Sequence, residues 1–152
     1  REKVKLMSKT ELTKQIEALL FKRLGRAEIG CGEVTIGWAG NEIVDFITCD
    51  VDRNRCINCF EIKVSKADLH SKAKLTFIGN YNYFVIPEEL YDEVKTEITS
   101  GIGVYIKTKD EFGRDELRCV RRAQYRDLKA DKTVILSSML RSMQREWFKT
   151  LK

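Results

Sequence analysis

The chain has 152 residues, and its 28 Lys+Arg against 23 Asp+Glu give a formal net charge of +5. The apolar fraction of 43% suits a globular protein and the charged fraction of 34% is high, so we expect one domain, residues 1–152, with a large solvated surface. No apolar run reaches the roughly 18 residues of a membrane span, and the first residues lack the apolar core of a secretory signal. These features predict a cytoplasmic protein without a membrane partner.

Hydrophobic periodicity predicts an alternating series of helices and strands. A first helix ends before Gly25, and three strands with short turns then form an antiparallel meander. The predicted elements are, in chain order, helix Thr10–Leu24; strands Cys31–Trp38, Glu42–Thr48 and Arg55–Val64; helix Lys66–Leu75; strand Tyr81–Ile86; helix Glu88–Ile98 behind Pro87; strands Ile102–Lys107 and Glu116–Arg122; and helix Ala130–Leu151. Because a crossover helix lets the fourth strand run parallel, the order predicts an α/β fold with a mixed sheet flanked by helices.

The histidine and cysteine content limits the metal chemistry. His70 is the only histidine, which excludes zinc sites with two or three His ligands. A metal site would therefore use carboxylates and backbone oxygens, which are the ligands of Mg²⁺ and Mn²⁺. The odd number of cysteines, five, indicates free thiols in a reducing compartment. Cys56 and Cys59 have the spacing of a zinc half-site or redox motif, but they enter a predicted strand and we interpret them as packing residues.

The final predicted helix carries an apolar stripe formed by Leu136, Leu140, Met143 and Trp147. This stripe could pack on the protein's own sheet, which we favour, or on a partner, which would make a homodimer possible.

The basic charge is concentrated toward the C-terminus. Residues 113–152 hold eleven Lys+Arg and five Asp+Glu, which gives +6, so the remainder of the chain carries −1. The densest group consists of Arg118, Arg121, Arg122 and Arg126. Such a group either forms a solvated surface or contacts a phosphate backbone.

Charged residues interrupt two neighbouring predicted strands. Asp45 lies inside an apolar run, and Glu61 and Lys63, two residues apart, point to one face of their strand. Because a buried charge is costly unless it is paired or metal-bound, these residues indicate either ion pairs or a functional site. The carboxylates of Asp45 and Glu61, with the carbonyl of Ile62, could hold a divalent cation, and Lys63 could orient or deprotonate a water that hydrolyses a phosphodiester.

This pattern resembles the PD-(D/E)XK nuclease superfamily, with Val44 in place of the name-giving proline. Further segments are similar to its MmcB-like DNA-repair branch: Glu61–Leu69, Tyr81–Pro87 and Gly101–Val104. The resemblance implies a restriction-endonuclease-like αβββαβ core over about residues 10–106, followed by a C-terminal strand and helix over 116–151, in one nuclease-like domain.

The resemblance also implies roles for individual residues. Asp45 and Glu61 would be catalytic metal ligands, Ile62 would bind the Mg²⁺ or Mn²⁺ through its carbonyl, and Lys63 would be the catalytic lysine. The superfamily often adds a further acid, for which Glu33 is the first choice and Glu17 and Glu11 are alternatives. The substrate-binding residues would lie on the helix after Lys63: Lys66, Asp68, Lys72 and Lys74. Lys72 departs from the family pattern, which has an acid there.

Three hypotheses of different classes follow. The leading one is a metal-dependent nuclease that hydrolyses DNA, in DNA repair or in the processing of phage or mobile-element DNA. The alternative is a non-catalytic nucleic-acid-binding module with a nuclease-like fold. The third is an interaction domain in which the acids form salt bridges.

Overall fold

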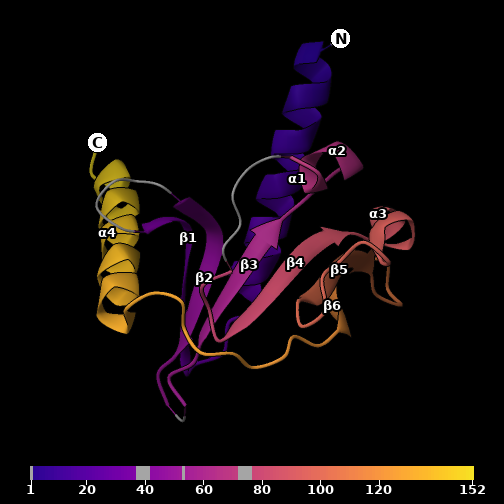
Figure 1. Ribbon diagram of the computed structural model, residues 1–152. Coiled ribbons are helices and arrows are strands. Elements are labelled where there is room, and N and C mark those ends of the chain that lie inside the picture. The colour runs from indigo at the N-terminus through magenta and orange to yellow at the C-terminus, as the bar shows by residue number, and fades with distance from the viewer. Residues whose placement is uncertain (1, 37–41, 53, 72–76) are drawn as a thin grey trace.

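The computed structural model describes residues 2–36, 42–52, 54–71 and 77–152, with residues 2–10 described by their backbone only (Figure 1). Its centre is one six-stranded sheet in which the strands follow chain order. Strands β3, β4 and β5 run parallel to one another, whereas β1, β2 and β6 join by antiparallel pairing, so the sheet is mixed as predicted. The strands are β1 Glu28–Ile36, β2 Glu42–Asp50, β3 Ile57–Ile62, β4 Tyr81–Pro87, β5 Gly103–Lys109 and β6 Asp115–Arg121.

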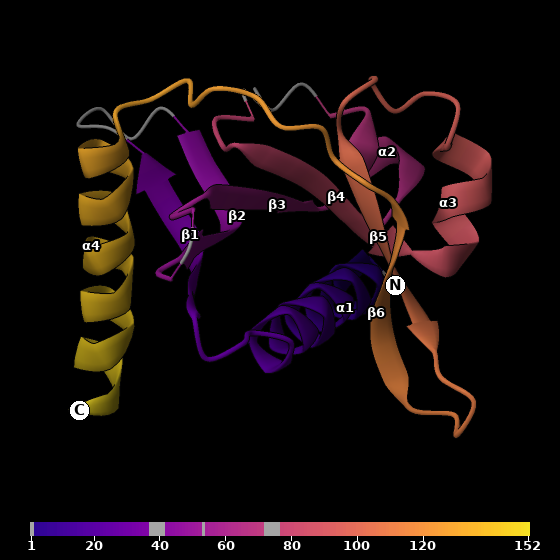
Figure 2. The same ribbon diagram turned by 90° about the horizontal axis from the view of Figure 1, so that it is seen from below.

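Helices cover both faces of this sheet (Figure 2). They are α1 Glu2–Lys22, α2 Lys66–Leu69, α3 Glu88–Val94 and α4 Lys132–Thr150. Helix α1 lies across one face, where its buried Ile16 and Leu20 pack on Phe46, Phe60 and Val85. Burial of such side chains contributes about 1.5–3 kcal/mol each, so this contact holds α1 firmly against the centre of the sheet.

The opposite face is covered in two places. Ile135 and Met139 of α4 pack on Ile47 of β2, and Leu90 of α3 packs on Ile86 of β4. Helix α4 therefore stands against β1 and β2 near one edge, while α3 lies toward the other (Figure 2). The order of elements and the α/β fold class are confirmed.

Several predicted boundaries are wrong. The first helix begins at Glu2, so Thr10 lies inside it and does not cap it. Helix α2 ends at Leu69, and residues 72–76 of the longer predicted helix lie outside the described residues. Pro87 is the last residue of β4 and has extended backbone, with φ −63° and ψ 147°, so α3 begins after it and ends at Val94. Apolar periodicity continues through a turn as readily as through a helix, which explains the overlong predictions.

The final helix packs on the protein's own sheet as predicted, but not through the predicted stripe. The stripe of Leu136, Leu140, Met143 and Trp147 is mostly exposed, with Leu140 at 66%. The buried residues of α4 are instead Ile135, Ser138, Met139 and Ser142. The Ser142 hydroxyl donates to the backbone carbonyl of Gly32 at 2.6 Å, so small polar residues let the helix approach β1 closely. Counting apolar residues therefore selected the wrong side of the helix.

The two sides of α4 should respond differently to truncation. We expect Met139→Ala to lower the free energy of unfolding by about 3 kcal/mol, because Met139 is 2% exposed and its removal leaves a cavity. Leu140→Ala, on the neighbouring residue, should change it by less than about 0.5 kcal/mol. Urea unfolding followed by circular dichroism measures both. A larger loss from Leu140→Ala would show that the apolar stripe is covered in solution.

Four of the five cysteines are buried in the core. Cys31, Cys49, Cys56 and Cys59 are buried free thiols, whereas Cys119 is an exposed one. Burial raises the pKa of Cys31 to about 11, which keeps this thiol protonated and unreactive.

Candidate active site

Asp45 and Glu61 lie side by side near the middle of the sheet. The pairing of Phe46 with Phe60 places Asp45 of β2 level with Glu61 of β3, and the paired residues of these strands end there. Beyond that point the backbone N–H of Ile62 in β3 donates to a side chain of β2 and not to its backbone: Oδ2 of Asp45 accepts this hydrogen bond at 2.7 Å. An acidic side chain thus enters the sheet because it satisfies a buried backbone donor.

The two carboxyl groups share a proton. Burial, followed by the negative charge of Asp45, raises the pKa of Glu61 to about 9, and the Glu61 carboxyl donates a hydrogen bond to Asp45. Burial also raises the pKa of Asp45, although the hydrogen bonds from Ile62 and Glu61 oppose this effect. Both shifts favour a protonated carboxyl group within the pair.

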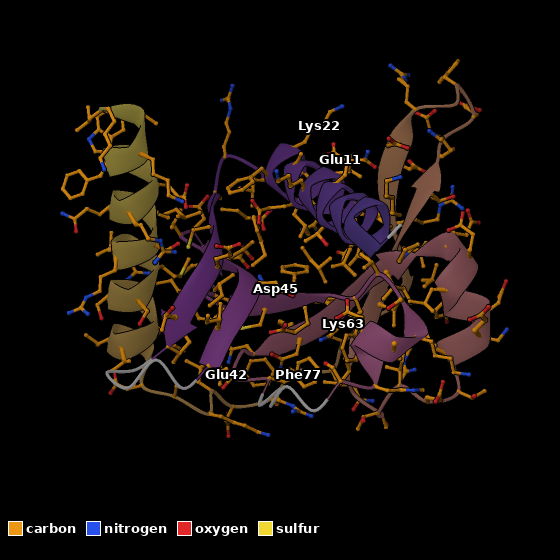
Figure 3. All side chains as sticks on the ribbon, turned by 90° about the horizontal axis from the view of Figure 1, so that it is seen from above. Glu11, Lys22, Glu42, Asp45, Lys63 and Phe77 are labelled. Atoms are coloured by element: carbon orange, nitrogen blue, oxygen red, sulfur yellow. The ribbon has the colours of Figure 1, made fainter. Side chains whose placement is uncertain are left out.

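Lys63 supplies a buried positive charge beside the pair. It is 6% exposed, and its charge lowers the pKa values of both Asp45 and Glu61. Its Nζ also lies 3.9 Å from Oδ1 of Asp68. Figure 3 shows Asp45 and Lys63 in the region between α1 and α2.

Asp68 is held rigidly at the start of α2. Its Oδ2 accepts the backbone N–H of Val64 and its own N–H donates to Oγ of Ser65, each at 3.0 Å. Ser65 thereby caps α2. Because the first contact holds the carboxylate and the second holds the backbone of the same residue, Asp68 can restrain the ammonium group of Lys63.

A cleft of about 890 Å³ adjoins Asp68, and its lining does not include Asp45, Glu61 or Lys63. It is lined by residues of α1, β1, α2, α4 and the segment after β3: Thr13, Lys14, Glu17, Phe21, Gly32, Glu33, Val64, Ala67, Asp68, Glu146 and Lys149. Four of these residues are acidic, against two lysines. Of these lining residues, Asp68 forms the ion pair with Lys63, and Glu17 is near enough to Asp45 for the charge of Asp45 to raise its pKa.

Glu17 is the acid from α1 that approaches the carboxylate pair. Its pKa is raised by burial and then by the charges of Glu33, Glu146 and Asp45. The approach depends on Gly32, because a Cβ there would lie 2.9 Å from Oε2 of Glu17. One sequence signal could have indicated it: Glu17 follows the fully buried Ile16 on the sheet-facing side of α1.

The other two candidates for the further acid lie differently. Glu33 is exposed at a left-handed backbone position, with φ 48°, and its carbonyl accepts a hydrogen bond from Arg145 at 2.8 Å. Glu11 is exposed on α1 (Figure 3). We therefore favour Glu17 over Glu33 and Glu11 as the partner of the carboxylate pair.

The predicted substrate-binding residues divide into two groups. Lys66 is exposed at the first position of α2, and Asp68 contacts Lys63 and lines the cleft. Lys72 and Lys74 lie outside the described residues. Sequence reasoning missed Glu146 and Lys149 of α4, which the fold brings to the cleft from the far end of the chain.

The donor set suits a hard divalent cation. Within the described residues, no group of three or more His, Cys, Asp or Glu side chains is arranged to hold a metal ion. Mg²⁺, however, is commonly bound through one or two carboxylates, with water and substrate phosphate completing its ligands. The proton shared by Asp45 and Glu61 marks a position where a cation would relieve their repulsion. The two carboxylates, with the adjoining carbonyl of Ile62, therefore fit Mg²⁺ or Mn²⁺.

Comparison with known proteins establishes the fold alone. No family model and no curated protein matches the chain. The solved structure of a protein of unknown function from Silicibacter pomeroyi is similar to it, with a TM-score of 0.61 and 18% sequence identity over 80% of this chain and 77% of that one. In the described part of the chain, helices that combine the length and apolar character of a membrane span are absent. The comparison thus supports an α/β fold with a mixed sheet.

Proposed function

We propose that the protein is a Mg²⁺- or Mn²⁺-dependent nuclease that hydrolyses phosphodiester bonds of DNA. The observation that carries this proposal is the placement of two carboxyl groups side by side, the half-buried Asp45 and the buried Glu61, next to the buried Lys63. Buried carboxyl groups this close are unfavourable without a cation, and perturbed pKa values of this kind concentrate at functional sites.

The contacts disfavour a simple salt bridge. In a structural ion pair, Lys63 would lie against Asp45 or Glu61 and both carboxyl groups would be ionised. Here the carboxyl groups of Asp45 and Glu61 form a hydrogen bond with each other. The ion pair of Lys63 is instead with Asp68, at 3.9 Å. Such an arrangement leaves the carboxylate pair available for another positive charge.

Each residue then has a role in hydrolysis. A bound divalent cation would polarise the phosphate and lower the pKa of water. Asp45 and Glu61 would hold that cation, and Lys63 would orient the attacking water against the phosphorus. Asp68 would restrain Lys63, and Glu17 would add negative charge near Asp45.

The test compares wild type and Lys63→Ala on plasmid and single-stranded DNA with Mg²⁺, Mn²⁺ or EDTA. We expect cleavage by the wild type with either metal, none with EDTA, and a loss of at least about 100-fold in Lys63→Ala, as for removal of a general acid–base group. Lys95→Ala is the matched control, because Lys95 forms only a surface ion pair with Asp92 on α3. Equal residual cutting by wild type and Lys63→Ala would indicate a contaminant and refute the nuclease proposal.

A further inference from the structure

The C-terminal half of α4 has a basic side. Arg141, Arg145, Lys149 and Lys152 recur every three or four residues, so they share one side of the helix and of the residues just after it. They surround a hollow of about 360 Å³ whose lining residues are Arg141, Gln144, Arg145, Phe148, Lys149 and Lys152. We call these six residues the α4 basic surface. None of these six residues is acidic, and Lys149 pairs with the neighbouring Glu146.

The α4 basic surface continues into the candidate active cleft. Lys149 lines both the hollow and the cleft. Arg145 donates to the backbone carbonyl of Glu33 at 2.8 Å, and Glu33 lines the cleft as well. Lys149 also pairs with Glu146, another cleft residue, at 3.0 Å. The basic and acidic regions therefore share an edge along α4.

The charge of the cleft explains why a cationic surface beside it would help a nucleic acid to bind. A cleft with four acids repels a phosphate backbone, and a single divalent cation offsets only part of that charge. A polyanionic substrate needs cations within about a Debye length, roughly 8–10 Å, of the site that it enters. The α4 basic surface provides them at the rim of the cleft.

Phe148 indicates the form of the nucleic acid. Its ring is 54% exposed although it lies among the cations of the hollow. Exposed aromatic rings within a basic groove are the usual means of binding single strands, because unpaired bases stack on them. In a duplex, the base faces are stacked on one another and cannot reach such a ring.

We propose that the α4 basic surface binds the backbone of single-stranded DNA, that Phe148 stacks on a base, and that the strand continues from there into the cleft. This inference rests on the proposed nuclease function and assigns its substrate class. It adds a binding surface outside α2, where the predicted substrate-binding residues lie.

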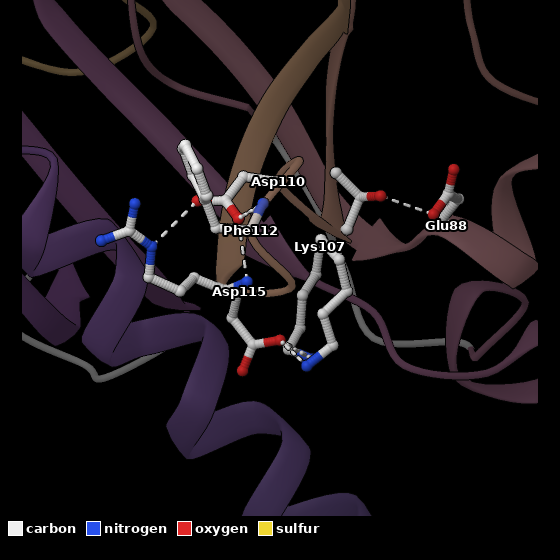
Figure 4. Close-up of polar contacts among 8 residues, drawn as sticks. Glu88, Lys107, Asp110, Phe112 and Asp115 are labelled. Carbon is white, nitrogen blue, oxygen red and sulfur yellow. Dashed lines mark hydrogen bonds and ion pairs between the residues drawn. The ribbon is translucent and has the colours of Figure 1, made fainter.

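The experiment measures binding in EDTA, so that it is independent of cleavage. Fluorescence anisotropy follows a fluorescein-labelled oligo(dT) and, separately, a hairpin duplex. The variants are Arg141→Ala and Phe148→Ala. Their controls are Arg114→Ala and Phe112→Ala on the β5–β6 hairpin, which lies at the opposite edge of the sheet from β1. Phe112, labelled in Figure 4, is 71% exposed and lies under Arg114. All four side chains are on the surface, and thermal unfolding verifies that each variant is folded.

We expect Phe148→Ala to weaken oligo(dT) binding by about fivefold or more, as loss of one stacked base predicts. Arg141→Ala should weaken it and reduce the slope of log K against log salt by about 0.7. The two controls should bind like wild type. Unchanged binding by both α4 variants, equal losses in the controls, or tighter binding of the duplex would overturn the assignment.

The outcomes separate this inference from the proposed function. Lys63→Ala should lose cleavage and keep oligo(dT) binding, which supports both. Cleavage by the wild type together with unchanged binding by Arg141→Ala and Phe148→Ala would refute the α4 surface and leave the nuclease intact. Binding that depends on Arg141 and Phe148, without cleavage under any metal condition, would refute the nuclease and retain the surface.

Discussion

Replacing Glu61 by Gln should abolish Mn²⁺ binding while making the metal-free protein more stable at alkaline pH. Glu61 is 5% exposed and its pKa is raised to about 9 by burial and by Asp45. A neutral Gln keeps nearly the same shape and still donates a hydrogen bond to Asp45, but it contributes no anionic ligand. Isothermal titration with Mn²⁺ should therefore show binding to wild type at pH 8 and none to Glu61→Gln.

The pH dependence of stability gives the same residue an independent test. Glu61 ionises at its ordinary value of 4.5 in the unfolded chain but stays protonated to about 9 in the folded protein. The folded state thus binds the extra proton, so this group's stabilisation is complete below pH 4.5 and is lost as the pH rises to about 9. The slope is at most about 1.4 kcal/mol per pH unit.

Urea unfolding at several pH values measures this slope. We expect the free energy of unfolding of wild type to fall between pH 5 and 9 more steeply than that of Glu61→Gln. The surface variant Glu93→Gln serves as the control, because Glu93 is exposed on α3. Parallel curves for wild type and Glu61→Gln would mean that Glu61 is ionised in the folded protein, and the shared-proton account would be wrong.

Gly103→Ala should be strongly destabilising although it adds a single methyl group. A Cβ at Gly103 would overlap ring carbons of Tyr83 and lie 2.6 Å from the backbone nitrogen of Ala123. The Tyr83 ring cannot move aside without cost, because it stacks on Phe60 with ring centroids 5.3 Å apart and contacts Tyr105. We expect the free energy of unfolding to fall by about 3 kcal/mol, at the upper end of the usual cost of overpacking.

Gly25→Ala is the matched control for this substitution. Its added Cβ would lie 3.6 Å from Oε1 of Glu28, an ordinary contact, and its cost should be below about 0.5 kcal/mol. Thermal unfolding of both variants measures the difference. A small effect at Gly103 would show that β4 and β5 move apart easily, contrary to the close packing of their aromatic residues.

Local sequence was sufficient where a conclusion depended on neighbouring residues. The meander brought Asp45 level with Glu61, and Lys63 follows directly after the end of β3. Asp68 was predicted on the helix that follows, where it has defined hydrogen bonds. These arrangements depend on residues within one strand, one turn or one pair of adjacent strands.

The sequence by itself determined the order of the elements, the α/β class and the position of Asp45, Glu61 and Lys63, because periodicity and short connections act over a few residues. Only the tertiary structure decided which acid of α1 approaches Asp45, since that depends on the missing side chain at Gly32. It also decided which side of α4 is buried, through a hydrogen bond between Ser142 and Gly32 that joins residues 110 positions apart. Contacts at that distance follow from how helices fit on the sheet, and no local pattern encodes that fit.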